Sequence, residues 1–290
     1  MPRCGYVALI GRPNAGKSSL LNRWVGEHVS IVSPKPQTTR ARSVGLLTRD
    51  DWQIVFCDTP GMLDSSRDAL DDAMREATTR AHQDADITVH LFDGTVPGDR
   101  PRAAERTNER DTLVAITKCD LLPEATRRLW REAVPSAAHV SAVTAEGLPE
   151  LLEQVVARLP EGPWVYPADD IGTATMRELA AEYVREAALH VLDDEVPHAL
   201  ACDVEEYRED RTPVYIRATL YVERESQKRI VIGSGGAQIR KIGAAARAAI
   251  ERIAAQKVFL DLWVKVLPNW RRDAASIRRF GLSHGKPGSR

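Results

Sequence analysis

The stretch that decides the fold of this chain is Gly11-Arg12-Pro13-Asn14-Ala15-Gly16-Lys17-Ser18. It follows an apolar run at residues 6–10 and precedes a helix-like segment at residues 19–24. A strand, a glycine-bounded loop, Lys-Ser and a helix, in this order, are typical of a phosphate-binding loop. A plain glycine turn between a strand and a helix is the alternative, and the full pattern in this context disfavours it. The stretch therefore predicts a site for a nucleoside triphosphate.

Each residue type in this loop has a chemical task. The glycines let the backbone turn tightly, so that successive N–H groups point at the phosphates. Lys17 supplies a positive charge for the outer phosphates, and the Ser18 hydroxyl is suited to ligate Mg²⁺. The expected nucleotide contacts of this region are Gly11, Asn14, Ala15, Gly16, Lys17, Ser18 and Ser19.

Bulk properties bound the remaining possibilities. A chain of 290 residues with 43% apolar residues fits two soluble domains. No apolar run reaches the length of a membrane-spanning helix, and residues 1–4 lead into the first strand without the apolar core of a signal peptide. The four cysteines have no metal-ligand spacing, which favours a reducing cytoplasm and disfavours structural zinc.

The net charge of −1 conceals an uneven distribution. Residues 211–290 contain 17 Lys and Arg against 5 Asp and Glu, whereas the rest of the chain contains 23 against 36. A basic segment of this kind is a candidate binding site for a polyanion, although a solvated basic surface would show the same composition.

The first part of the chain alternates strand and helix patterns, as a parallel α/β sheet requires. We expect a strand at 42–49 to pair antiparallel with the next one and a last helix at 148–159. The expected buried strands are 6–10, 52–57, 86–92, 112–116 and 138–143.

Three prolines and a glycine between residues 160 and 167 indicate a linker, so we expect domains at 1–160 and 175–290 joined by residues 161–174. The second domain alternates helices and strands in a different order, and residues 283–290 are expected to be a frayed end. Its expected elements are helices near 175–193, 226–231 and 237–254, strands at 199–206, 213–222 and 257–266, and a short C-terminal helix.

Further motifs indicate which nucleotide is bound. Asp58-Thr59-Pro60-Gly61 ends the 52–57 strand, where an acid can hold the Mg²⁺ shell and the Gly61 N–H can sense a γ-phosphate. Thr38-Thr39 lies in the loop before the second strand, and a threonine there can complete the magnesium shell only while the γ-phosphate is present.

The base is read by a later motif, Thr117-Lys118-Cys119-Asp120. The carboxylate of Asp120 can accept both N–H groups of the guanine N1/N2 edge, which adenine lacks, and the stem of Lys118 can cover the purine face. Ser141-Ala142-Val143 follows another strand and can offer a backbone N–H to guanine O6. All of these loops follow strand ends, where α/β sheets bind ligands, so we predict guanine.

The order of these motifs resembles the Era group of GTPases. The C-terminal part strengthens the resemblance, because residues 231–243 are similar to the signature of a KH domain and residues 257–266 to the strand that follows it. The resemblance covers residues 5–282. It implies a Ras-like P-loop GTPase domain with a doubly wound, mostly parallel sheet, followed by an α+β type II KH domain.

The resemblance also assigns roles. It implies that Lys17, Thr39 and Gly61 are the catalytic residues, that Ser18, Thr39 and Asp58 hold Mg²⁺, and that Asn14 ligates a K⁺ ion. Thr39 is chosen over Thr38 by resemblance only. Two positions depart from the usual pattern: Thr117 stands where the family has asparagine, and Met62 stands where Ras-like enzymes have a water-orienting glutamine. A threonine hydroxyl can replace part of the bridge to the P-loop, and Met62 predicts slow intrinsic hydrolysis.

A Gly-x-x-Gly loop between two helices lets a nucleic-acid backbone approach closely, because no Cβ stands in the way. A structural helix–turn–helix is the alternative. The loop carries no basic residue of its own, so the charge must come from its neighbours. The expected RNA contacts are Lys228, Arg229, Gly233, Ser234, Gly235, Gly236, Arg240 and Lys241.

The leading hypothesis is a GTP-hydrolysing switch, with GTP or GDP and Mg²⁺ bound, that controls access to single-stranded RNA. The resemblance implies the 3′ end of small-subunit ribosomal RNA, small-subunit assembly, and peripheral association with the cytoplasmic face of the inner membrane. We expect a cytoplasmic monomer. An RNA chaperone in which GTP is only structural is the alternative, and a trafficking GTPase with a lipid-binding tail is disfavoured by the glycine loop.

Overall fold

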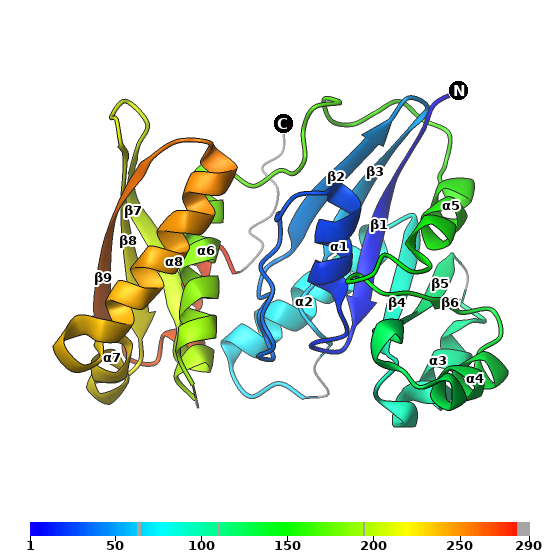
Figure 1. Ribbon diagram of the computed structural model, residues 1–290, viewed down its shortest axis with the longest axis horizontal. Coiled ribbons are helices and arrows are strands. Elements are labelled where there is room, and N and C mark those ends of the chain that lie inside the picture. Colours follow the sequence, from blue (N-terminus) through cyan, green and yellow to red (C-terminus); the bar gives the residue numbers. More distant parts are fainter. Residues whose placement is uncertain (63–64, 110, 194, 283–290) are drawn as a thin grey trace. The chain divides into compact units, whose positions relative to one another are not determined.

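The structure is a computed structural model that describes residues 1–62, 65–109, 111–193 and 195–282. The frayed end expected at 283–290 lies outside the described residues. The chain divides into two compact units (Figure 1). Unit 1 contains residues 1–30, 39–65 and 74–173, and unit 2 contains residues 31–38, 66–73 and 174–290.

Unit 1 is built on a six-stranded sheet in the order β2-β3-β1-β4-β5-β6. All neighbouring strands are parallel except β2, which pairs antiparallel with β3 and places Arg49 opposite Trp52. The strands are β1 (Arg3–Gly11), β2 (Ser43–Arg49), β3 (Trp52–Asp58), β4 (Ile87–Asp93), β5 (Thr112–Thr117) and β6 (Ala138–His139). This arrangement confirms the doubly wound, mostly parallel sheet that the alternation of strands and helices predicts.

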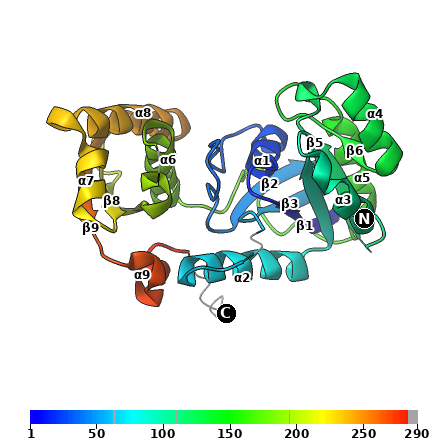
Figure 2. The same cartoon turned by 90° about the horizontal axis from the view of Figure 1, so that it is seen from below.

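The helices cover both faces of this sheet, and Figure 2 shows α1 and α2 on opposite sides of it. Alternate side chains of β1, β3 and β4 join apolar residues of α1 and α5 in one buried core. Phe92 and Ile116 pack on the other face with Trp130 of α4. The helices are α1 (Lys17–Val25), α2 (Ala69–Asp84), α3 (Arg100–Arg106), α4 (Glu124–Ala133) and α5 (Leu148–Arg158).

Strand β6 is much shorter than the strand expected at 138–143. The Ser141 hydroxyl accepts hydrogen bonds from the backbone N–H groups of Val143 (3.2 Å) and Thr144 (3.1 Å). These local bonds turn the chain out of the sheet immediately after Val140, so residues that read as strand form a loop instead.

The segment expected to be a linker is bound along unit 1 as far as residue 173. Gly162 N–H donates to the Pro2 carbonyl (3.0 Å), and Leu46 N–H donates to the Ile171 carbonyl (3.0 Å). Between these points the fully buried Gln53 side chain accepts from the N–H groups of Val165 (2.9 Å) and Tyr166 (3.0 Å). We call residues 160–173 the strap.

Unit 2 contains a three-stranded sheet with helices on one face (Figure 1). Strand β8 is central, antiparallel to β7 and parallel to β9. The order αββααβ fits a type II KH domain. Its elements are α6 (Met176–Val191), β7 (Ala201–Arg208), β8 (Val214–Val222), α7 (Glu225–Ile232), α8 (Ala237–Ala254), β9 (Val258–Val266) and α9 (Ala274–Arg279).

Two short segments from the N-terminal half belong to unit 2. Ile31 lies in the same apolar core as α6 and β8, and Val32 N–H donates to the Glu186 carboxylate of α6 (2.8 Å). Asp68, just before α2, forms an ion pair with Arg271 (2.6 Å). The loop between α1 and β2 is therefore divided, with residues 31–38 held in unit 2 and residue 39 onward in unit 1.

Candidate functional site

The loop after β1 has the backbone geometry of a phosphate cradle. Gly16 precedes α1 with a φ of 88°, which only glycine adopts without strain, and Asn14 has a φ of 63°. At the start of the loop a Cβ on Gly11 would lie 2.4 Å from the Leu91 carbonyl oxygen, so no side chain fits there. The loop ends at the N-terminus of α1, whose first N–H groups lack helical partners and suit an anion.

Lys17 is buried inside this loop. Its Nζ donates to the carbonyl oxygens of Gly11 (3.1 Å) and Arg12 (3.0 Å), which draw the side chain across the cradle. Burial lowers the pKa of Lys17 to about 8, and the nearby Asp58 carboxylate opposes this shift. An ammonium group held in a poorly hydrated position is poised to gain strongly from an incoming phosphate.

Three oxygen-bearing side chains converge next to the loop. The Ser18 hydroxyl lies 2.9 Å from the Thr39 hydroxyl and donates to the Asp58 carboxylate (2.5 Å). Thr38 turns away, since its hydroxyl donates to the Lys35 carbonyl (2.6 Å). The geometry thus places Thr39, not Thr38, beside Ser18.

Asp58 is fully buried, and this oxygen cluster fits a magnesium ion. Asp58 Oδ2 accepts from Ser18 and Ser30, whereas Oδ1 is buried without a hydrogen-bond partner. Burial raises the pKa of Asp58, because a carboxylate is costly in a poorly solvated site. A hard divalent cation that accepts oxygen ligands would satisfy both the orphaned oxygen and the buried charge.

The loop after β3 packs directly on the P-loop. The Thr59 hydroxyl donates to the Leu9 carbonyl (2.8 Å), and Met62 N–H donates to the Gly11 carbonyl (3.0 Å). A Cβ on Gly61 would lie 2.5 Å from the Pro13 nitrogen. Residues 58–62 therefore touch the loop that would hold the outer phosphates, which suits them to sense a γ-phosphate.

The expected base-reading motif follows β5. Lys118 has a left-handed backbone (φ 59°), and its ammonium group pairs with Asp93 at 2.6 Å, so its stem is held in one direction. Among the residues described, the Asp120 carboxylate has no recorded hydrogen bond and is partly exposed. Ser141 is buried and shapes the neighbouring loop, on which Val143 is 79% exposed.

Thr117 connects the base-reading motif to the P-loop. Its hydroxyl lies 2.9 Å from the Ala15 carbonyl and 3.1 Å from the Phe92 carbonyl, and it bridges β4, β5 and the phosphate loop. The bridge expected of the usual asparagine is thus present with threonine at this position.

The glycine loop of unit 2 joins α7 to α8. Gly233, Gly235 and Gly236 all have positive φ values, of 72°, 55° and 78°. Glycine is required at 233 for space as well, because a Cβ there would lie 2.6 Å from Gln238, whereas a Cβ on Gly235 meets nothing within 4 Å. The loop is open at Ser234 and Gly235, both exposed.

The four basic residues predicted to contact RNA flank this loop on α7 and α8. Three of them are exposed, and Lys228 is half-buried. Within the part of the chain that the structure describes, none has a recorded ion pair, so their charge is available to a polyanion. They are Lys228, Arg229, Arg240 and Lys241.

Several residues at the nucleotide site were not predicted from the sequence. Ser30 holds Asp58, and Asp93 holds Lys118. Arg127 of α4 pairs with Glu146 (2.5 Å) and donates to the Cys119 carbonyl, which ties the two base-side loops together. Asp93 had a usable signal, because it ends a buried strand as Asp58 does. Ser30, Arg127 and Glu146 lie in polar segments where nothing in the sequence distinguishes them.

Comparison with known proteins supports this description. A family model described as 50S ribosome-binding GTPase matches residues 6–120, and a KH domain model matches residues 195–271. The chain is 39% identical over 302 residues to GTPase Era of Nitratidesulfovibrio vulgaris (strain DP4), covering 97% of each chain. It is 41% identical over 296 residues to GTPase Era of Mycobacterium avium (strain 104), covering 97% of this chain and 99% of that protein.

Two crystal structures are similar over nearly the whole chain at 35% identity. One is an Aquifex aeolicus Era variant bound to GDP and AlF4⁻, with a TM-score of 0.91 and coverage of 97% of this chain and 100% of that chain. The other is Era in complex with MgGDPNP and nucleotides 1506–1542 of 16S ribosomal RNA, with a TM-score of 0.90 and coverage of 98% and 100%.

Fold and site together define a P-loop GTPase joined to a C-terminal KH domain. Both domains occur together in the relatives, because the similarity extends over nearly the full length of both chains. The chain belongs to the Era family of GTPases.

Proposed function

We propose that this protein hydrolyses GTP with Mg²⁺ and uses the nucleotide state to control binding of single-stranded ribosomal RNA. The observation that carries the nucleotide part is the cluster of Ser18, Thr39 and Asp58, with one buried carboxylate oxygen of Asp58 lacking a partner. This arrangement suits a magnesium ion placed beside a phosphate cradle. The crystal structures of relatives with MgGDPNP and with GDP and AlF4⁻ support the same assignment.

The residues divide the work as follows. Lys17 neutralises the β- and γ-phosphates, Ser18 and Thr39 hold Mg²⁺ with Asp58 nearby, and Gly61 N–H binds the γ-phosphate. Asp120 and Lys118 read guanine, and the loop of Ser141, Ala142 and Val143 completes the base pocket. Met62 has no group that orients water, so the intrinsic rate is slow.

The RNA site is the loop from Gly233 to Gly236 with its four flanking cations. Two exposed loop residues and cations without recorded ion pairs support contact with a single-stranded backbone. A relative was crystallised with nucleotides 1506–1542 of 16S ribosomal RNA, which supports the 3′ end of small-subunit ribosomal RNA as the target here. Assistance to assembly of the small ribosomal subunit is the function that unites the two sites.

Two measurements test this function. Single-turnover GTP hydrolysis, with and without an oligonucleotide of the 3′ rRNA end, should show phosphate release that depends on Lys17. RNA affinity measured with GDP and with a non-hydrolysable GTP analogue should differ. Absence of any phosphate release would favour the alternative in which GTP only stabilises an RNA-binding module.

A double substitution separates the RNA site from the nucleotide site. Ser234→Asp with Gly235→Asp places two negative charges where a phosphate backbone would pass, and no Cβ clash arises at Gly235. We expect loss of RNA binding with unchanged GTP affinity. Unchanged RNA affinity would refute the assignment of this loop.

Asn14 is proposed to ligate a K⁺ ion that adds positive charge next to the phosphates. Asn14 lies in the middle of the P-loop with a left-handed backbone (φ 63°). Hydrolysis should be faster in K⁺ than in Na⁺ buffer, and Asn14→Ala should remove the difference. Equal rates in the two buffers would exclude this role.

We propose a cytoplasmic location with peripheral association at the inner membrane, supported by the family resemblance and by the basic surface of residues 211–290. Among the described residues, none of the helices has the length and apolar character needed to cross a bilayer. Flotation with vesicles containing anionic lipid tests the association, and recovery of the protein only in the soluble fraction would contradict it.

A further inference from the structure

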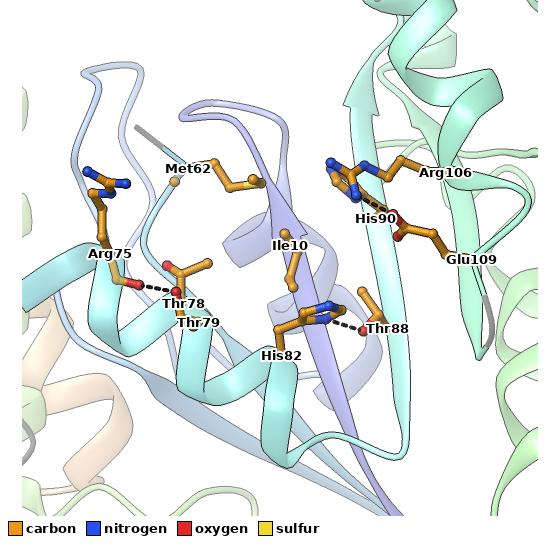
Figure 3. Close-up of a pocket in the computed structure, with 11 residues that line it drawn as sticks. Ile10, Met62, Arg75, Thr78, Thr79, His82, Thr88, His90, Arg106 and Glu109 are labelled. Atoms are coloured by element: carbon orange, nitrogen blue, oxygen red, sulfur yellow. Dashed lines mark hydrogen bonds and ion pairs between the residues drawn. The ribbon is translucent and has the colours of Figure 1, made fainter. Parts of the chain in front are cut away.

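A cavity of about 260 Å³ lies in unit 1 on the side of the sheet covered by α2 and α3 (Figure 3). Its walls come from the end of β1, from the first half of β4, from α2, and from the end of α3 with the loop after it, and its rim includes Gly61 and Met62. No residue of the predicted guanine-reading motif lines it. The cavity is therefore separate from the guanine-reading motif and lies beside the loop of Gly61, which we propose to sense the γ-phosphate.

Strand β4 gives this cavity an unusually polar floor. Val89 and Leu91 point into the apolar core on the other face of the sheet, whereas Thr88 and His90, which alternate with them, line the cavity. His90 is only 8% exposed and stacks on Phe92 with ring centroids 4.6 Å apart. Among the described residues no hydrogen bond of its ring is recorded, so its nitrogens are open to a molecule in the cavity.

The hydroxyl groups around the cavity already form hydrogen bonds within the protein. Thr78 donates to backbone carbonyls of Pro60 (3.1 Å) and Met74 (3.0 Å), and Thr79 donates to the Arg75 carbonyl (2.9 Å). The Thr88 hydroxyl is shared with His82 Nδ1 at 2.9 Å. A ligand must therefore be recognised by other groups.

The remaining polar groups are mainly donors. Arg106 is neutralised by its ion pair with Glu109, whereas the Arg75 guanidinium has no recorded ion pair within the described part of the chain. Figure 3 shows Arg75 and Arg106 on opposite sides of the Met62 side chain. Among the residues that the structure describes, the lining thus combines one cation without a recorded ion pair, Arg75, with the apolar surfaces of Ile10 and Met62.

We propose that this cavity binds a compact organic anion, with a carboxylate paired to Arg75 and a flat apolar body lying between Ile10, Met62 and the His90 ring. A guanidinium group binds a carboxylate with two parallel hydrogen bonds, which fixes the orientation of the ligand. The apolar body gains its affinity by leaving water, and the ring of His90 offers it a flat surface.

Such a ligand acts on the nucleotide site through Met62. The Met62 N–H is bonded to the Gly11 carbonyl at the start of the P-loop, and its side chain borders the cavity. A molecule seated against Met62 stabilises this arrangement of residues 58–62. Ligand affinity and nucleotide affinity are then linked, and each changes the other by the same factor.

Methyl NMR of the full chain, saturated with Mg²⁺ and GDP, tests the site directly. Among the methionines, Met62 borders the cavity, and Met176 of α6, which belongs to unit 2 and does not line the cavity, serves as the reference. The probe is naphthalene-2-carboxylate, and its neutral amide is the matched control. We expect the carboxylate to shift the Met62 methyl signal with a Kd on the order of 1 mM, as suits a ligand of this size, and the amide to bind roughly tenfold more weakly.

Two variants locate the carboxylate. Arg75→Ala should abolish the shift, whereas Arg80→Ala, on the same helix but outside the cavity and paired with Glu76, should leave it unchanged. An equal response to acid and amide, a shift that survives in Arg75→Ala, or no shift at roughly tenfold the expected Kd would each overturn the proposal. The readout requires no GTP hydrolysis, so its failure is distinguishable from failure of the proposed function.

Discussion

At the scale of single residues, the nucleotide site depends on side chains that bridge separate loops. Thr117 spans β4, β5 and the P-loop with one hydroxyl, and Ser18 joins the P-loop to Asp58. The residues that we propose to touch the nucleotide carry strong sequence signals, because the chemistry of phosphate, magnesium and guanine restricts each position. Supporting residues such as Ser30 and Arg127 became visible only in three dimensions, because many polar residues could serve there.

Replacing Thr117 by valine tests the bridge. Valine keeps the shape but leaves the buried carbonyls of Ala15 and Phe92 without a donor, which costs about 1–3 kcal/mol. We expect GDP affinity, measured by calorimetry, to fall by roughly tenfold or more. Thr117→Ser retains the hydroxyl and should bind GDP nearly as well as the wild type. Equal affinities for the valine and serine variants would contradict the bridge.

His90 makes stability depend on pH. Burial lowers its pKa from the ordinary 6.5 to about 4, so between these values the unfolded chain binds a proton that the folded chain does not. The free energy of unfolding therefore decreases as pH falls from about 6.5 to about 4. Above about pH 6.5, His90 is neutral in both states and the free energy of unfolding does not depend on its titration.

The matched variant is His90→Phe, which keeps a flat ring over Phe92 but cannot titrate. In urea unfolding, the loss of stability between about pH 7 and about pH 4.5 should be smaller in this variant than in the wild type by about 2 kcal/mol. An identical loss in both proteins would show that folding does not lower the pKa of His90.

At the scale of elements, the periodicity of apolar residues predicts the strands and helices. It does not predict how irregular segments such as the strap are bound. The parallel strands were predicted by apolar runs, and the antiparallel β2–β3 hairpin by its two-residue turn. The bound strap was read as a linker, since its prolines and glycine are equally typical of a free connection. Its attachment depends on Gln53, a polar residue inside an apolar strand, whose partners in the strap lie more than a hundred residues away in the sequence.

Gln53→Leu should release the strap. The substitution removes the acceptor for the Val165 and Tyr166 N–H groups, and the donor to the Tyr166 carbonyl, inside a fully buried site. We expect a loss of stability of about 2–3 kcal/mol and faster amide exchange at residues 165 and 166. Thr48→Val is the control, because it removes another partner of the same side chain (3.0 Å) without touching the strap. Unchanged exchange in the Gln53 variant would refute the role of this side chain.

At the scale of the whole molecule, the two compact units do not coincide with two continuous stretches of sequence. Residues 31–38 and 66–73 are packed in the unit that contains the KH domain. The buried Arg185 of α6 donates to the Thr38 carbonyl, and the next residue, Thr39, lies beside Ser18 in the nucleotide site. Motif order predicted two domains, but no local pattern in the sequence indicates that residues 31–38 and 66–73 belong to unit 2.

Arg185→Met should uncouple the two activities. It removes the hydrogen bond to Thr38 while keeping an apolar stem in the core. Where the RNA affinities with GDP and with a GTP analogue differ, by 1–3 kcal/mol in typical coupled systems, this difference should shrink toward zero. Filter-binding titrations of both nucleotide states measure it.

Arg177→Met is the control for the loss of an arginine from α6. Arg177 donates to the carbonyls of Val204 and Glu205 and makes no recorded contact with residues 31–38. The coupling should persist in this variant. If the difference in RNA affinity between the two nucleotide states is as large in Arg185→Met as in the wild type, the contact with Thr38 does not couple the two sites.

The packing of residues 31–38 in unit 2 has a consequence for experiments on truncated forms of the protein. A fragment ending at residue 173 would retain the whole nucleotide motif set yet expose Ile31, which is only 3% accessible in the intact chain. Conversely, a fragment starting at residue 174 would leave an apolar gap beside α6 where Ile31 belongs. Neither fragment therefore keeps the packing of the intact chain. Activities measured on either fragment alone will differ from those of the full-length protein.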